Sequence, residues 1–91
     1  MKTYRVIVSG KVQGVGFRAY VSQAAQKEQL KGTVRNLSDG TVEIILQGSE
    51  EDLQTLTHIL RTPQHAFMKV ADVRTQEVTP ETNHQSFTII Y

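Results

Sequence analysis

Apolar and polar residues alternate near the start of the chain at the spacing of a β-strand. The two sets are Tyr4, Val6 and Val8 on one side and Arg5, Ile7 and Ser9 on the other. Successive side chains of a strand point to opposite faces of a sheet, and β-branched residues fit such a surface well. The pattern therefore predicts a strand over residues 3–12 with one face buried.

The apolar spacing changes to that of a helix after residue 16. The apolar positions are Phe17, Tyr20, Val21, Ala24 and Ala25, and the polar positions are Ser22, Gln23, Gln26, Lys27 and Gln29. This amphipathic pattern predicts a helix that packs on a sheet. We expect Gly32 to stop the helix and Lys31 to complement the negative end of its dipole.

Two further strands are predicted at residues 33–37 and 41–47. The pair Asp39-Gly40 between them is a strong hairpin signal. The inward row of the second strand is expected to be Val42, Ile44 and Leu46. A hairpin therefore forms the middle of the predicted fold.

A second helix is predicted at residues 49–61. Ser49 can cap it, with Asp52 three residues on, and Pro63 is expected to end it. The predicted buried stripe is Leu53, Leu56, Ile59 and Leu60. A loop at 62–69, a strand at 70–79, a polar loop at 80–85 and a short strand at 86–91 complete the chain. In the last strand Phe87, Ile89 and Tyr91 alternate with polar or outward positions.

The predicted order is typical of the ferredoxin-like arrangement, an α+β sandwich with βαββαβ order. We expect a mostly antiparallel sheet with both helices on one face, plus the short C-terminal strand. Exposed Glu43, Ile45 and Gln47 would lie on the other face, open to water. The sequence leaves the pairing of the terminal strand open.

Composition limits the possible functions. A chain of 91 residues is expected to form one domain, residues 1–91. It contains no Cys, which excludes disulfides and thiolate metal sites. The net charge of +1 argues against nucleic acid or a membrane surface as a partner. Without a signal-like or spanning segment, a cytoplasmic monomer is expected.

The loop between the first strand and the first helix carries the chemistry. Its sequence is Gly10-Lys11-Val12-Gln13-Gly14-Val15-Gly16-Phe17-Arg18. Glycines allow positive φ, so successive N–H groups can converge on one anion, and the helix adds its positive end. The Arg18 guanidinium adds a charged fork of donors. The loop is therefore interpreted as an anion cradle, with an ordinary structural turn as the alternative.

Two common phosphate-binding motifs are absent from this loop. Gly10-Lys11 is followed by Val12, whereas a Walker loop requires Ser or Thr there. The glycines at 10, 14 and 16 also do not fit the order Gly-x-Gly-x-x-Gly of dinucleotide-binding folds.

Asn36 lies at the end of a predicted strand, where asparagine is unusual. Its amide can bond to nearby backbone in a turn, so a turn cap is one interpretation. A functional role for the side chain is the other.

Residues 10–18, the segment Gly32-Thr33-Val34-Arg35-Asn36 and the segment Asp39-Gly40-Thr41-Val42-Glu43 together resemble the acylphosphatase family. The resemblance is strongest over residues 4–48. It implies a small metal-free enzyme that hydrolyses the carboxyl–phosphate anhydride of acyl phosphates, with inorganic phosphate as a product. It further implies that Arg18 binds the phosphate and that Asn36 positions the attacking water. The backbone cradle would comprise Gln13, Gly14, Val15, Gly16, Phe17 and Arg18.

The remaining residues are consistent with this chemistry. His58, His65 and His84 lack the paired spacing of a metal site, so neither metal nor cofactor is expected. The loop has no Cys and no evident Ser–His pair, which favours direct attack by water over a covalent intermediate. Because ferredoxin-like folds host many functions, a non-catalytic anion-binding or regulatory domain remains the alternative. RNA binding is disfavoured by the near-neutral charge.

Overall fold

The computed structural model describes residues 1–62 and 68–91. The elements within these residues are β1 (Lys2–Lys11), α1 (Phe17–Lys27), β2 (Lys31–Asn36), β3 (Val42–Gly48), α2 (Glu50–Arg61), β4 (Lys69–Glu77) and β5 (Phe87–Ile90). The predicted elements are confirmed to within a few residues at their ends. Most of the predicted loop at 62–69, with Pro63 and His65, lies outside the described residues.

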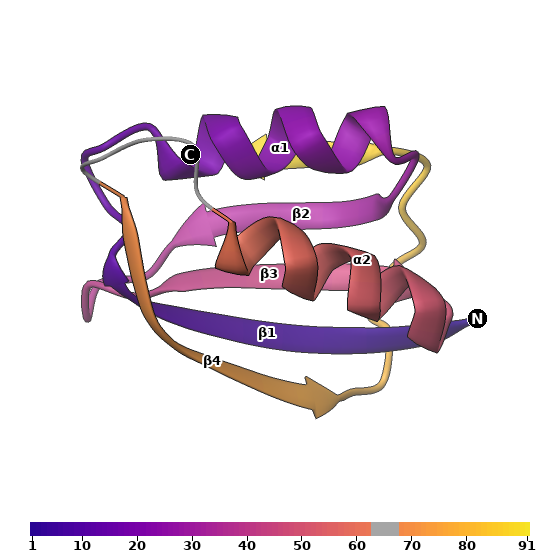
Figure 1. Ribbon diagram of the computed structural model, residues 1–91. Coiled ribbons are helices and arrows are strands. Elements are labelled where there is room, and N and C mark those ends of the chain that lie inside the picture. The colour runs from indigo at the N-terminus through magenta and orange to yellow at the C-terminus, as the bar shows by residue number, and fades with distance from the viewer. Residues whose placement is uncertain (63–67) are drawn as a thin grey trace.

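The strands form one sheet in the order β4-β1-β3-β2-β5. β1, β2, β3 and β4 pair antiparallel, whereas β5 pairs in parallel with β2 at one edge of the sheet. Both helices lie on the same face of the sheet (Figure 1). The predicted α+β fold with βαββαβ order and a C-terminal strand is confirmed, and β5 now has a defined partner.

The core lies between the helices and the sheet. Its fully buried side chains include Val6, Val8, Phe17, Val21, Val34, Ile44, Leu46, Leu56, Leu60 and Phe87. They come from the inward rows of the strands and from the apolar stripes of both helices, as the sequence pattern predicts. Burial of this apolar surface is the main term that stabilises the fold.

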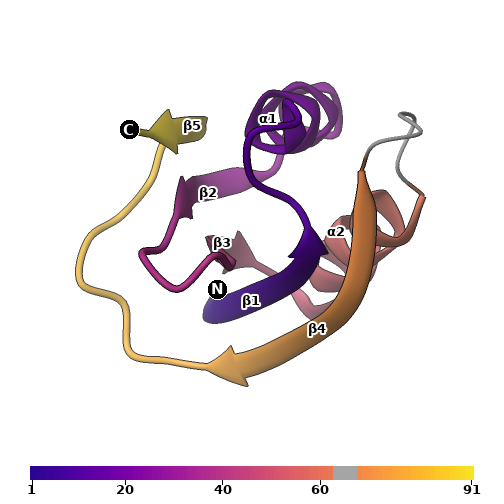
Figure 2. The same cartoon turned by 90° about the vertical axis from the view of Figure 1, so that its left-hand side faces the viewer.

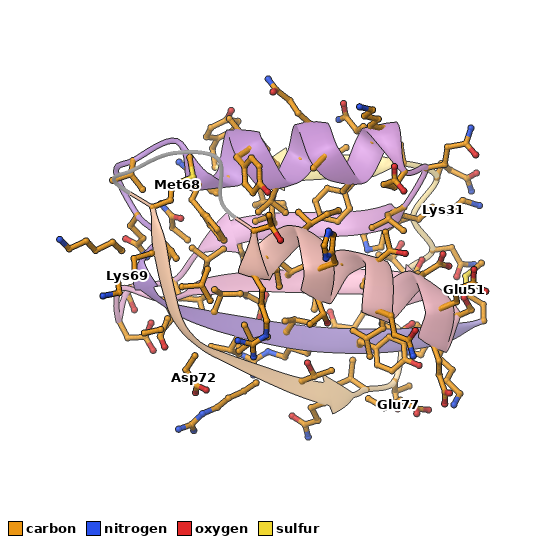
Figure 3. All side chains as sticks on the ribbon, viewed as in Figure 1. Lys31, Glu51, Met68, Lys69, Asp72 and Glu77 are labelled. Carbon is orange, nitrogen blue, oxygen red and sulfur yellow. The ribbon has the colours of Figure 1, made fainter. Side chains whose placement is uncertain are left out.

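β4 forms the other edge of the sheet, and an exposed edge strand can pair with another chain. Charged residues lie along it, among them Lys69, Asp72 and Glu77, which are labelled in Figure 3 and are exposed. Charges on an edge strand disfavour such pairing.

The face of the sheet opposite the helices is not open, contrary to the prediction for Glu43 and Gln47. Both residues are buried, and Ile45 is half-buried. The connection from β4 to β5, residues 78–86, crosses this face, as Figure 2 shows. Gln47 holds it, because its Nε2 donates to the Thr82 carbonyl and its Oε1 accepts from the His84 N–H at 2.7 Å. We call residues 78–86 the strap.

The end of α1 also differs from the prediction. The helix stops at Lys27, and Gln29 adopts the left-handed conformation with φ of 58°. The N–H of Leu30 donates to the Ala25 carbonyl and that of Gln29 to the Gln26 carbonyl, which together form a Schellman motif. Gln29 thus has the role that the prediction gave to Gly32.

Gly32 lies inside β2, at φ of 154°. A Cβ at this position would collide with the backbone carbonyl of Ile45 on the neighbouring strand. The glycine is therefore required by the close approach of β2 to β3, a long-range contact that the local sequence does not reveal.

Two polar residues of α1 make contacts that the sequence pattern did not indicate, although Gln26 itself is exposed. Ser22 is buried, contrary to the prediction, and Gln26 Nε2 donates to the Phe87 carbonyl at 2.8 Å. Both follow from the position of β5, which extends the sheet under this side of α1. At the start of α2 the predicted cap is confirmed, since Ser49 and Asp52 form a reciprocal capping box.

The Schellman motif gives a stability prediction. Gln29→Gly is expected to stabilise the protein by about 0.5–1 kcal/mol, because glycine adopts the left-handed conformation without the cost that a side chain incurs. Gln23→Gly is the matched control. Gln23 is exposed within the same helix, so its replacement should destabilise by about 1 kcal/mol. Urea denaturation measures the change in the free energy of unfolding for both variants. If the two changes have the same sign, the left-handed Gln29 does not end the helix in the way described.

Candidate active site

The glycine-rich loop enters α1 through two left-handed residues. Gly14 has φ of 72° and Gly16 has φ of 81°. Gly16 is the N-cap of α1, and it provides no side-chain cap; the first turn contains no acidic residue. Among the described residues, no backbone N–H from 13 to 17 donates to a backbone carbonyl. The positive end of the helix dipole and these N–H groups are thus available for an anion.

Gln13 fixes the loop to the β2–β3 hairpin. Its side-chain Nε2 donates to the carbonyl oxygens of Leu37 and Thr41, each at 2.8 Å. The hairpin is itself held by Asp39, whose Oδ1 accepts from the Thr41 N–H at 3.0 Å and from its hydroxyl at 2.6 Å. These bonds lower the pKa of the Asp39 carboxyl. The loop and the end of β2 are therefore held together.

A hollow of about 150 Å³ lies where the loop meets β2 and β5. It is lined by Gly14, Gly16, Phe17, Arg18, Ala19, Asn36, Ile89 and Tyr91. Arg18 and Asn36, which are 18 positions apart in the sequence, thus line the same small space. We call this space the loop hollow.

The predicted loop does not line this hollow along its whole length. Gln13 and Val15 line a separate hollow of about 520 Å³, together with Lys11 and Gly40, and Gly14 contributes to both. The side chain of Gln13 serves to hold the loop. Whether its backbone and that of Val15 contact a ligand stays a prediction.

Asn36 has an unusual environment for an asparagine. Its Oδ1 is buried and has no hydrogen-bond partner among the described residues. Asp39, and not Asn36, makes the side-chain bonds of the adjacent turn. The turn-cap interpretation therefore has no hydrogen bond to support it in the described part of the chain. A buried acceptor without a partner is costly, and such groups commonly have a functional reason.

Arg18 is held by the end of β5. Its Nη1 donates to the Ile90 carbonyl at 3.3 Å, and its Cζ lies 5.0 Å from the centre of the Tyr91 ring, within cation–π range. One nitrogen of the guanidinium is used in this contact. The other N–H groups stay available for an anion in the loop hollow.

Sequence analysis missed the contributions of Ile89 and Tyr91. Their alternation was visible, but the parallel pairing of β5 with β2 was not. Arg35 of β2 is paired with Ile90 of β5. Because the two strands run in parallel, Asn36 and Tyr91, which follow these residues, lie at the same end of the two strands.

Among the described residues, no group of three or more His, Cys, Asp or Glu side chains is arranged to hold a metal ion. Within residues 1–62 and 68–91, no helix has both the length and the apolar character that a membrane crossing requires.

The contact between Arg18 and Tyr91 gives a second prediction. Tyr91→Ala should weaken the binding of inorganic phosphate by about twofold to fivefold, because an exposed cation–π contact that holds the guanidinium is lost. Tyr91→Phe retains the aromatic face and should bind like the unchanged protein. Phosphate titrations followed by the amide NMR signals of Gly14 and Gly16 measure both. If Tyr91→Phe is impaired as much as Tyr91→Ala, the ring face does not position Arg18.

The chain is similar to known proteins over its full length. The family model described as Acylphosphatase matches residues 4–89. The chain is 45% identical to the acylphosphatase of Bacillus licheniformis over 91 residues, with 100% of both chains covered. It matches the crystal structure of acylphosphatase from Bacillus subtilis with a TM-score of 0.88 and 42% identity over 100% of both chains.

The same fold also occurs within a longer chain. The crystal structure of T. kodakarensis HypF matches 100% of this chain with a TM-score of 0.88 and 32% identity, but the match covers 12% of that chain. The family model and the full-length relatives together show that the chain belongs to the acylphosphatase family.

Proposed function

We propose that the loop hollow hydrolyses acyl phosphates by direct attack of water, with Arg18 and the loop N–H groups holding the phosphoryl group and Asn36 positioning the water. The family model and the full-length relatives identify the chain as an acylphosphatase, a hydrolase acting on acid anhydrides. The proposal concerns which residues do this and how.

Binding of the phosphoryl group uses the uncapped start of α1. The N–H groups around Gly14 and Gly16 and the first turn of α1 supply neutral donors, and Arg18 supplies a full positive charge. Hydrogen bonds from a charged donor to phosphate oxygens are stronger than neutral ones. Donors fixed by the fold before the substrate arrives also stabilise the charge of the transition state without rearrangement.

The buried Oδ1 of Asn36 is the single observation that carries the assignment of the water. Asn36 lines the loop hollow, and its amide oxygen can accept a hydrogen bond from a water molecule there once the side chain rotates toward the hollow. A water that donates a hydrogen to Oδ1 keeps its lone pairs on the side away from that bond. In the proposal they point toward the phosphorus of the phosphoryl group that Arg18 holds in the same hollow. Asn36 thus orients the nucleophile and does not need to remove its proton.

The chemistry requires no strong base. The oxygen of water forms a bond to phosphorus, the phosphorus–oxygen bond to the acyl group breaks, and the carboxylate leaves with the electron pair. Among the described residues lining the loop hollow there is no Asp, Glu or His side chain. The proton of the water therefore passes to a phosphoryl oxygen or to solvent. This is adequate because phosphoryl transfer depends mainly on positioning and charge stabilisation.

The alternative of a non-catalytic anion-binding domain accounts for the cradle but not for Asn36. Anion binding needs only donors, which Arg18 and the loop N–H groups supply, so it assigns no role to the unpaired Oδ1 of Asn36. Arg18 and Asn36 of the same chain line the loop hollow, so the proposed mechanism does not require a second copy. We therefore also infer that a monomer is sufficient for activity, and a cytoplasmic location is part of the same proposal.

Metal independence is the first prediction of this mechanism. Protein dialysed against a strong chelator should release phosphate from a synthetic acyl phosphate at the same rate as untreated protein, because Arg18 supplies the positive charge. Phosphate release in a colorimetric assay, with and without added magnesium or zinc, measures this. Turnover that vanishes with chelator and returns with metal would exclude the mechanism.

The second prediction separates the two roles of the side chains. Arg18→Ala should lower kcat/KM by about a hundredfold to ten-thousandfold, since two charge-assisted hydrogen bonds are lost. It should also raise the inhibition constant of inorganic phosphate. Asn36→Ala should lower kcat by about a hundredfold to a thousandfold but leave phosphate inhibition unchanged, because it acts only on the attacking water.

Two controls accompany these variants. Arg18→Lys should restore activity only in part, because an ammonium group cannot reproduce the planar fork. Denaturant melts on the same preparations separate catalysis from stability. If Asn36→Ala keeps full activity and only unfolds earlier, Asn36 is structural and another group positions the water.

A further inference from the structure

Another hollow lies on the face of the sheet away from the helices, beneath the strap. It has a volume of about 390 Å³, and its lining includes Thr3 and Arg5 of β1, Thr33 and Arg35 of β2, and Ile45 of β3, with Glu81 on the strap. Figure 2 shows how the strap passes over this face, away from both helices. We call this space the strap hollow. Its volume is in the range of small-molecule sites.

Two arginines share one buried carboxylate in the strap hollow. Arg5 Nε lies 2.6 Å from Glu43 Oε2, and Arg35 Nε lies 2.8 Å from Glu43 Oε1. The Glu43 side chain is 7% exposed, whereas those of Arg5 and Arg35 are 42% and 48% exposed. The carboxylate is therefore at the floor, and it fixes the two guanidinium groups on either side of it. The three charges sum to one net positive charge.

Further donors around this cluster are unused. Arg5 and Arg35 each bond through Nε, and their Nη atoms have no hydrogen-bond partner among the described residues. The hydroxyl groups of Thr3 and Thr33, which line the same space, also make no hydrogen bond within residues 1–62 and 68–91. Two guanidinium groups held together by one carboxylate repel each other less when a second anion joins them. Ile45 supplies an apolar surface beside these donors.

We propose that the strap hollow is a second anion site, which binds a small organic oxyanion with its charged group between Arg5 and Arg35 and its apolar part over Ile45. Arginine suits this role because its planar fork matches the oxygens of carboxylate and phosphate. The site is distinct from the loop hollow, which lies at the other face of the sheet and contains Arg18.

Other charged groups face the strap hollow from the strap. Glu81 opposes anion binding, and it forms no ion pair with either arginine among the described residues. His84 also lines the space and adds positive charge when it is protonated. The two hollows share β2 and β5, because Arg35 and Ile90 line this one while Asn36 and Tyr91 line the other.

NMR titration of the ¹⁵N-labelled full chain tests the proposal. Arg18→Ala is used as the background, so that the loop hollow contributes little binding. Benzoate is expected to give saturable shifts of the amide signals of Thr33, Ile45 and Ile90. Acetate should bind about threefold to tenfold more weakly, because it lacks the apolar part that contacts Ile45. Shifts confined to Gly14 and Gly16, or equal affinities for the two ligands, would overturn the proposal.

Benzoate affinity in three further variants tests which charged side chains of the strap hollow act on the bound anion. Arg35→Gln should weaken benzoate binding by about fivefold to tenfold, through loss of a charged donor at a half-exposed position. Arg74→Gln is the matched control, since Arg74 is an exposed arginine of β4 paired with Asp72, and it should leave binding unchanged. Glu81→Gln should tighten binding by about twofold, through loss of an exposed like charge. A gain of affinity cannot arise from misfolding, so unchanged affinity in both Arg35→Gln and Glu81→Gln would exclude the site.

Discussion

The hydrogen bonds from the Gln13 side chain to the hairpin are the contacts on which the catalytic geometry depends. They join the glycine-rich loop, which precedes α1, to the carbonyl oxygens of Leu37 and Thr41, which follow β2. Arg18 lies in the first turn of α1, directly after the loop, and Asn36 is the last residue of β2, directly before Leu37. The two side chains can cooperate on one phosphoryl group only if the segments keep a fixed separation. A single amide with two donors provides that link.

The edge strand β5 has a larger role than its length suggests. Its parallel pairing with β2 brings Ile89 and Tyr91 to the loop hollow and the Ile90 carbonyl to Arg18. The chain reaches this edge by way of the strap, which bonds to the buried Gln47 on the face opposite the helices, where Arg5 and Arg35 flank the buried Glu43. The segment from the strap to Tyr91 thus contributes to the loop hollow on the helix side of the sheet and to the strap hollow on the opposite face.

The described side chains that line the loop hollow include one charged group, the Arg18 guanidinium, beside the positive end of α1. Gly16 caps α1 without a side-chain hydrogen bond, and no carboxylate lies in the first turn to compete for the positive end of the helix. Arg18 is the cation among the described lining residues, and Asn36 contributes a neutral acceptor. In the proposed mechanism this combination binds the phosphoryl group and leaves one acceptor for water. It fits an anhydride substrate whose carboxylate leaves readily.

The sequence by itself determined the order of the elements, the buried rows of β1 and β3 and the Ser49 capping box, and it led to the proposal of Arg18 and Asn36 as site residues. Those features depend on periodicity, on local hydrogen bonding and on the resemblance to the acylphosphatase family. Tertiary structure alone decided that Gly32 serves strand packing, that Glu43 and Gln47 are buried, and that Tyr91 contacts Arg18. Each of these depends on residues far apart in the chain. Local sequence specifies which face of a strand is apolar, but it does not specify which strand lies beside it or which loop crosses it.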